Sequence, residues 1–193
     1  MNLLVLGPQG AGKGTQASLI AEEYGVPHIS TGAMFRDAVA AQTPLGRKVG
    51  PILERGELVP DELTVQLIGE RLSAPDAAEG FVLDGFPRNL RQASELDELL
   101  AGLGKRLDAI LFFDLPDEHA IARLERRAEQ EKRSDDTPEA IQRRLRIYHE
   151  ETEPVIEHYR ATGSLVPLHA AREIGEVWAE TQAALDHLRK AHA

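Results

Sequence analysis

The chain has 193 residues, 22 Lys and Arg against 32 Asp and Glu, a formal net charge of −10, and no cysteine. This length predicts one domain, and the acidic balance disfavours a general nucleic-acid binder, which needs a basic face. The lack of cysteine excludes disulfides, cysteine-ligated zinc and thiol catalysis. No apolar run approaches the roughly 20 residues of a membrane span, and Gly7–Pro8 interrupts the first apolar segment, so we expect a cytoplasmic protein without a signal peptide.

Short apolar runs bounded by Gly, Pro or Asp alternate with helical patterns along the chain. In chain order the pattern predicts strand Asn2–Leu6, helix Gly12–Tyr24, strand Pro27–Ser30, helices Met34–Ala41, Leu45–Arg55 and Asp61–Leu72, strand Gly80–Asp84, helix Asn89–Leu103, strand Asp108–Asp114, helices Asp117–Ala128 and Pro138–Arg160, strand Ser164–Leu168 and helix Ile174–Ala191. Strands that alternate with helices predict an α/β fold with a parallel sheet covered on both faces.

Two stretches fit this alternation poorly. Residues 31–72 place several helices between two strands, and residues 126–136 are polar, charged and without period. We interpret both as candidate insertions that move as lids.

A glycine-rich segment follows the first strand: residues 7–15 read Gly-Pro-Gln-Gly-Ala-Gly-Lys-Gly-Thr. Glycines let backbone N–H groups turn towards one point, the next helix adds its positive end, and Lys13 adds a mobile cation, which together predict a cradle for a polyphosphate. A chance turn with a lysine is the alternative, at a probability on the order of 10⁻⁴. In phosphate-binding loops of this kind a Ser or Thr usually follows the lysine, and its hydroxyl binds Mg²⁺. Because Gly14 stands at that position here, we expect Mg²⁺ to be held more by nucleotide oxygens and water.

Four motifs together carry a family resemblance: the glycine-rich segment continued by Gln16, then Ser-Thr-Gly at 30–32, Gly-Glu-Leu-Val-Pro-Asp at 56–61, and Asp-Gly-Phe-Pro-Arg at 84–88. In order and spacing the chain closely resembles adenylate kinases of the short-lid form, almost from end to end. The resemblance implies ATP + AMP ⇌ 2 ADP with Mg²⁺, on a three-layer P-loop fold with a five-stranded parallel sheet. It also implies a core at 1–29, 60–125 and 137–193, a helical AMP-binding insertion at 30–59 and a lid at 126–136.

The resemblance implies an acceptor site for AMP. Thr31 and Gln92 would recognise adenine, and Arg36 and Arg88 would hold the phosphate. The backbone of Glu57, Leu58 and Val59 would lie against the adenine base. Gly85, Phe86 and Pro87 would also contact AMP. Arg88 follows a strand's carboxyl end, where α/β sheets bind ligands, and its guanidinium fits a phosphate in a fixed orientation. Gln92 comes four residues after Arg88, so we expect both on one helix face.

The resemblance also implies the donor site and the catalytic groups. ATP would contact Gly10, Ala11, Gly12, Lys13, Gly14, Thr15, Arg123, Arg127 and Arg172. Lys13, Arg88, Arg123, Arg127, Arg133 and Arg144 would be catalytic, with Arg133 and Arg144 also reaching AMP, and Asp84 would organise Mg²⁺ through water. An alternative role for Asp84 is to cap the next turn. No general base is required, because a phosphate with a second pKa near 6 is already ionised at pH 7.

Bystander residues and rival functions complete these expectations. We expect Arg126, Arg143 and Arg146 to be solvated and the seven histidines to be bystanders. A UMP/CMP kinase shares the fold, but Thr31 and Gln92 favour AMP. A non-catalytic nucleotide-binding module would not need so many cations. The expected partners are ATP, AMP and ADP, with neither nucleic acid, membrane nor obligate protein partner, and the family's usual state is a monomer.

Overall fold

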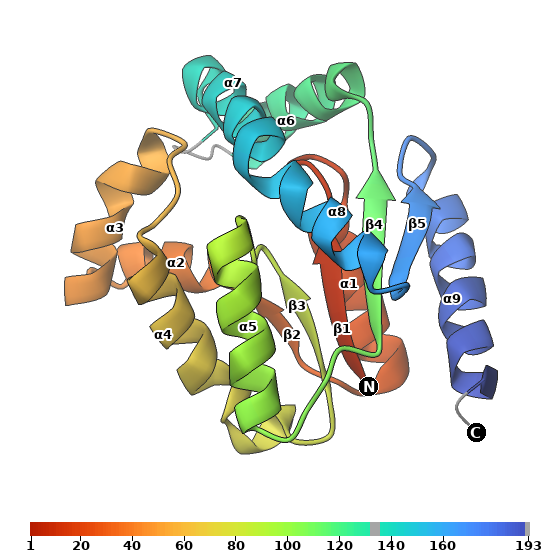
Figure 1. The fold of residues 1–193 in the computed structure, drawn as a ribbon. Coiled ribbons are helices and arrows are strands. Elements are labelled where there is room, and N and C mark those ends of the chain that lie inside the picture. Colours follow the sequence, from red (N-terminus) through yellow and green to blue (C-terminus); the bar gives the residue numbers. More distant parts are fainter. Residues whose placement is uncertain (132–135, 192–193) are drawn as a thin grey trace.

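The computed structural model describes residues 1–131 and 136–191, and in this part a five-stranded parallel sheet forms the centre (Figure 1). The strands are β1 (Asn2–Leu6), β2 (His28–Ser30), β3 (Phe81–Asp84), β4 (Ala109–Asp114) and β5 (Leu165–His169). Their order is β2-β3-β1-β4-β5, and Val5 of β1 lies opposite Asp84 of β3 and Leu111 of β4. The predicted α/β fold with a parallel sheet is confirmed.

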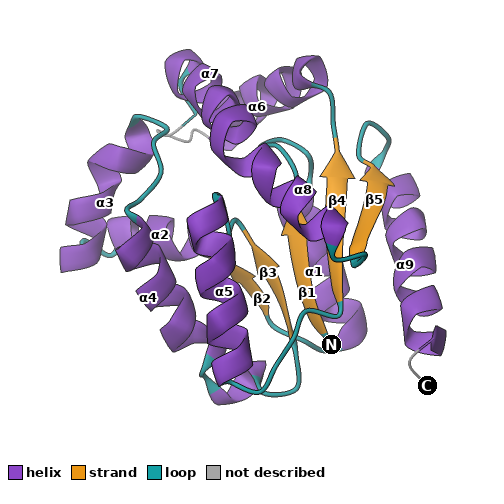
Figure 2. Cartoon of the chain, viewed as in Figure 1, coloured by secondary structure: helices purple, strands orange, loops and turns teal. Residues whose placement is uncertain are grey.

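Helices cover both faces of the sheet (Figure 2). They are α1 (Lys13–Tyr24), α2 (Thr31–Ala40), α3 (Pro44–Glu54), α4 (Asp61–Leu72), the 3₁₀ turn η1 (Pro75–Ala77), α5 (Leu90–Gly102), α6 (Asp117–Glu131), α7 (Pro138–Ile147), the π-helical turn η2 (Tyr148–Thr152), α8 (Glu153–Ala161) and α9 (Ile174–Ala191). No helix among the described residues is both long and apolar enough to cross a bilayer.

Strand β1 is apolar from Leu3 to Leu6 because this part is buried on both sides. Leu3 and Val5 join one core cluster with residues of α1, α6, α7 and α9, whereas Leu4 and Leu6 join another with residues of α4, α5 and α8. Successive side chains of a strand point to opposite faces, so one run of four apolar residues supplies both cores.

Helices α2 and α3 have a small core of their own. Phe35, Val49 and Val59 form a third apolar cluster, separate from the two that flank the sheet. The two helices touch at Gly46, where a Cβ atom would lie only 1.9 Å from the carbonyl oxygen of Ala38. These helices therefore pack mainly on each other, whereas Ile68 and Leu72 of α4 belong to the main core.

Three helices differ from the sequence prediction by more than one residue. The helix expected over 138–160 contains the π turn, in which the Glu153 N–H donates to the Tyr148 carbonyl, next to Pro154, which has no N–H to give an α-helical ladder. Helix α2 begins at Thr31 rather than Met34, because the Ser30 hydroxyl accepts from the Ala33 N–H. Helix α6 extends beyond Ala128 to Glu131, so the start of the expected lid is helical.

Candidate functional site

A cleft opens at the carboxyl ends of the strands, and residues of α2, α3, α6 and α7 contribute to its lining. Figure 1 shows α6 and α7 above this end of the sheet and α2 and α3 to one side of it. The cleft lies at the point where the strand order reverses, because β2 and β3 lie on one side of β1 whereas β4 and β5 lie on the other. This location is typical of ligand sites in open α/β sheets. Its lining brings together most of the predicted cations and one predicted carboxylate: Lys13, Arg36, Asp84, Arg88, Arg123, Arg127 and Arg144.

The glycine-rich segment forms the floor of the cleft. Gly10 and Gly12 have φ angles of 84° and 81°, a left-handed conformation that favours glycine. A Cβ atom on Gly10 would lie 2.9 Å from the carbonyl oxygen of Ala120 in α6, so the segment packs directly on that helix. Gly12 immediately precedes α1, which directs the unpaired N–H groups of the helix start into the cleft.

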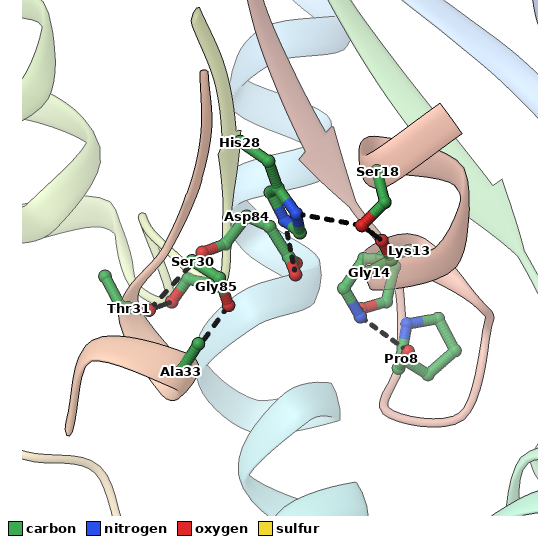
Figure 3. Close-up of polar contacts among 11 residues, drawn as sticks. Pro8, Lys13, Gly14, Ser18, His28, Ser30, Thr31, Ala33, Asp84 and Gly85 are labelled. Atoms are coloured by element: carbon green, nitrogen blue, oxygen red, sulfur yellow. Dashed lines mark hydrogen bonds and ion pairs between the residues drawn. The ribbon is translucent and has the colours of Figure 1, made fainter. Parts of the chain in front are cut away.

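Lys13 folds back over this segment. Its Nζ donates to the carbonyl oxygens of Gly7 and Pro8, each at 2.7 Å, and Figure 3 shows the side chain lying near Asp84. Burial, helped by the charges of Arg88 and Arg127 and opposed by Asp84, lowers the pKa of Lys13 to about 8. The ammonium group of Lys13 thus donates to carbonyl oxygens here, whereas it would donate to phosphate oxygens when a phosphate is bound.

Asp84 ends β3 inside the cleft. Burial alone would raise the pKa of its carboxyl group, but contact with His28 and the charges of Lys13 and Arg88 hold that pKa below its usual value. His28 Nε2 lies 3.6 Å from Asp84 Oδ2, and His28 Nδ1 lies 3.2 Å from the Ser18 hydroxyl (Figure 3). The expectation that every histidine is a bystander is therefore wrong for His28.

The surroundings of Asp84 fit a hydrated magnesium ion. An ionised oxygen ligand suits this hard cation, and a Cβ on Gly14 would lie 3.7 Å from Asp84 Oδ2, so Gly14 leaves room beside the carboxylate. Among the described residues, no group of three or more His, Cys, Asp or Glu side chains could hold a metal by itself. A metal here would take its remaining ligands from water and a bound nucleotide.

Arg88 and Gln92 meet at the start of α5, although not as predicted. Arg88 precedes the helix, and the two residues meet because Gln92 Oε1 accepts from the Arg88 N–H at 2.8 Å. The side chain of Asn89, which caps α5, accepts from the Gln92 N–H at 2.8 Å. Asn89 and Gln92 thus form a variant of the capping box, in which the Gln92 side chain accepts from the N–H of the residue before the cap. Gln92 Nε2 donates to Asp61 Oδ1 at 2.7 Å. The shared helix face expected for Arg88 and Gln92 is therefore wrong, whereas their proximity is confirmed.

The guanidinium of Arg88 lies in a positive environment. Burial and the neighbouring charges of Arg144 and Arg36 lower the pKa of Arg88, against the opposing effect of Asp84, and Arg88 Nε donates to the Gly85 carbonyl at 2.8 Å. Several buried cations close together repel one another, and a bound polyanion would relieve that repulsion.

A smaller pocket beside Arg88 gathers residues predicted to contact adenine: Thr31, Glu57, Leu58, Val59, Gly85 and Gln92. The Thr31 hydroxyl donates to the Gly85 carbonyl at 2.9 Å (Figure 3), and a Cβ at position 85 would lie 2.6 Å from that hydroxyl. Both predicted base-reading side chains, Thr31 and Gln92, thus have protein partners already.

Asp136 holds two of the predicted catalytic arginines. Arg127 donates to its carboxylate through Nε at 2.7 Å and a terminal nitrogen at 2.8 Å, and Arg144 donates at 2.8 Å. The side chain of Asp136 is fully buried. Sequence reasoning missed this residue, since nothing distinguishes it from other acids of the chain except its place at the end of the predicted lid.

The remaining predicted residues divide into three groups. Arg123 lines the cleft and donates to the carbonyl of Arg172 at 3.1 Å, whereas Arg172 itself does not line the cleft and its side chain pairs with Glu180 at 3.6 Å. Arg126, Arg143 and Arg146 are exposed as expected, and Arg143 in addition pairs with Glu57 at 2.8 Å. Arg133 lies outside the described residues.

Comparisons with known proteins agree with one another. The family model described as adenylate kinase matches residues 5–164. Proteins named adenylate kinase from Thermus thermophilus and Kosmotoga olearia are 49% and 43% identical to the chain, covering 95% and 97% of it and 96% and 100% of their own lengths. One of the same name from Archaeoglobus fulgidus is 41% identical, over 98% of this chain and its own full length.

Proposed function

Because the chain belongs to the adenylate kinase family and is an ATP:AMP phosphotransferase, we propose that the cleft described above is where ATP + AMP ⇌ 2 ADP takes place. The observation that carries this proposal is the joining of Lys13, Asp84 and Arg88 with the lid-side Arg123, Arg127 and Arg144 around one cleft. Phosphoryl transfer depends mainly on alignment and charge neutralisation, which such a set of cations supplies.

The donor site lies on the glycine-rich segment. ATP phosphates would bind the backbone of residues 10–15 at the start of α1, where Lys13 exchanges its two carbonyl partners for phosphate oxygens. Arg123 and Arg127 would meet the phosphates from α6. Arg172 would contribute its backbone rather than its guanidinium, because its side chain pairs with Glu180.

The acceptor site lies in and around the smaller pocket. Arg36, Arg88, Arg133 and Arg144 would bind the AMP phosphate, while Thr31, Gln92 and the backbone of residues 57–59 would surround adenine, with residues 85–87 forming one wall. To read the base, Gln92 would share the amide that now bonds Arg88 and Asp61.

Two arginines would change partner during the reaction. Arg127 and Arg144 are held by the buried carboxylate of Asp136. A phosphoryl group carries more charge than one carboxylate, so it would draw both guanidiniums from Asp136 towards itself. The two guanidiniums would then neutralise the charge that develops on transfer. Asp84 would hold Mg²⁺ through water, and the ion would supply further neutralisation of the phosphates.

The proposal also covers organisation and location. Residues 30–59, which have their own small core, would be the AMP-binding insertion, and residues 126–136 the lid. We infer that the protein acts as a monomer in the cytoplasm and needs neither a nucleic acid nor a protein partner.

A coupled assay for ADP formation, with AMP, UMP and CMP as acceptors, tests the acceptor identity. A buried amide left without its partner costs roughly 1–3 kcal/mol, so kcat/KM for AMP should exceed the others by about 5- to 150-fold. A better rate with UMP or CMP would indicate a pyrimidine nucleotide kinase. ATP binding without transfer to any acceptor would indicate a non-catalytic module.

A further inference from the structure

Helix α7 contacts the last turn of α3 and the segment that follows it at three points. The helix follows Asp136 and carries Arg144, and the segment contains Gly56 and the predicted adenine-contacting backbone of residues 57–59. These contacts join the acceptor side of the cleft to the helix behind the lid.

The closest of these contacts involves backbone alone. Gly56 has a φ angle of 68°, and a Cβ atom at this position would lie 2.6 Å from the carbonyl oxygen of Ala140 in the first turn of α7. A side chain at position 56 would push the segment away from the helix. Nearby, the Arg144 guanidinium donates to the Leu53 carbonyl at 3.4 Å.

The third contact is an ion pair between side chains. Arg143 donates to Glu57 Oε1 at 2.8 Å, and Arg55 donates to the other oxygen of Glu57 at 2.9 Å and 3.0 Å. The carboxylate of Glu57 therefore links its own segment to α7. The sequence alone gave Arg143 no such role, because its partner lies 86 positions away.

We propose that Arg143 is a positioning residue for the acceptor nucleotide, acting through Glu57 to hold the backbone of residues 57–59 against the smaller pocket. Leu58 and Val59 line that pocket together with Gln92, and Val59 also belongs to the third apolar cluster. The inference rests on the proposed function, because it assigns that pocket to AMP.

The position of α7 extends the consequence to the donor side. The same helix carries Arg144, which bonds Asp136 together with Arg127. A movement of α7 on nucleotide binding would therefore carry the acceptor segment with it, and binding free energies coupled in this way are reciprocal between the two sites.

The expected effect is modest, because both partners are partly exposed. The side chains of Arg143 and Glu57 are 45% and 37% exposed, and ion pairs of this kind are weak and sensitive to salt. Arg143→Ala should raise KM for AMP by about 2- to 5-fold, with kcat and KM for ATP nearly unchanged. Arg143→Lys should retain much of the wild-type KM, because it keeps the charge.

Arg146→Ala is the matched control, since Arg146 is an exposed arginine on the same helix that does not line the cleft. A double-mutant cycle isolates the interaction between Arg143 and Glu57. The single variant Glu57→Gln should raise KM for AMP, and adding Arg143→Ala to that variant should raise KM for AMP little further. The difference between Arg143→Ala and wild type should shrink at about 0.5 M salt. Thermal unfolding of each variant confirms that it is folded.

Equal KM values for AMP in Arg143→Ala and Arg146→Ala would overturn the inference, as would fully additive effects of the two substitutions or an equal rise in KM for ATP. These outcomes leave the proposed function intact, provided that the wild-type protein phosphorylates AMP. A wild-type protein that phosphorylates no AMP would instead refute the proposed function itself.

Discussion

The amide of Gln92 offers a sharp test of the acceptor pocket, because Gln92→Glu changes its hydrogen bonding and almost nothing of its shape. The side chain is 1% exposed and makes two hydrogen bonds: Oε1 accepts from the Arg88 N–H and Nε2 donates to Asp61 Oδ1. The substitution preserves the accepted bond. It replaces the donor to Asp61 with a second carboxylate oxygen.

The size of the loss follows from the distance and from the cost of protonation. Two unit charges at the present 2.7 Å separation would repel by about 6 kcal/mol at an effective dielectric constant of 20. The new carboxyl group avoids this repulsion by binding a proton, which at pH 7 costs about 3.7 kcal/mol for a group whose ordinary pKa is about 4.3. We therefore expect the free energy of unfolding at pH 7 to fall by about 2–4 kcal/mol.

The loss should depend on pH in a defined direction. The folded state raises the pKa of the introduced carboxyl group, so the loss is absent below about pH 4.3, where the group is protonated in both states, and it grows as the pH rises. Urea unfolding of the variant and wild type at matched pH values between 4 and 8 measures the difference.

Gln66→Glu is the matched control. Gln66 is exposed and donates to Glu70 at 3.0 Å, so the same substitution there also opposes two carboxylates, but in water, and should cost about 0.5 kcal/mol. Equal losses at positions 66 and 92, or a loss at 92 that does not change with pH, would refute this account of the buried amide.

Three further predictions concern the cations and the metal. Arg127→Ala should lower kcat by about 30- to 900-fold, by analogy with the loss of one oriented donor to a transition state, whereas the exposed Arg126→Ala should retain the wild-type kcat; similar rates in both variants would contradict the assignment. The dissociation constant of ATP should rise about 10-fold between pH 7 and pH 9 as Lys13, whose pKa is about 8, loses its proton, while Lys13→Arg should show no such slope by calorimetry. A chelator should stop transfer and leave the Tm of the ligand-free protein unchanged, since no described cluster of side chains could hold a metal alone; a lower Tm would indicate a structural metal.

Local pattern was sufficient for the sheet and for most helices, because in these segments one feature decides the structure. The apolar run of β1 predicts a strand buried on both faces, and it supplies residues to both cores. Helix ends were less predictable where a single contact sets them. Ser30 starts α2 three residues before the apolar pattern begins at Met34, and Pro154 converts part of the expected long helix into a π turn.

Within the site, motif residues were predictable and their distant partners were not. Lys13, Asp84 and Arg88 belong to contiguous motifs and meet in one cleft, as expected. Several predicted site residues have partners from elsewhere in the chain. His28 lies beside Asp84, Asp61 accepts from Gln92, and Asp136 accepts from both Arg127 and Arg144. An Asp or a His has no local pattern that announces such a partner, because the contact exists only once the chain is folded.

Gly10 packs against Ala120 near the start of α6, so a tilt of the helix about this contact would move the far end of the helix most. The glycine-rich segment abuts the helix at Ala120, near its start, while the helix continues without interruption to Glu131. Arg127 lies seven residues beyond the pivot, or about 10 Å along the axis, so a tilt of about 10° would move its backbone by roughly 2 Å. A tilt about this contact would therefore displace Arg127 by much of the length of a hydrogen bond. A side chain at position 10 would collide with the carbonyl oxygen of Ala120 and separate the two surfaces.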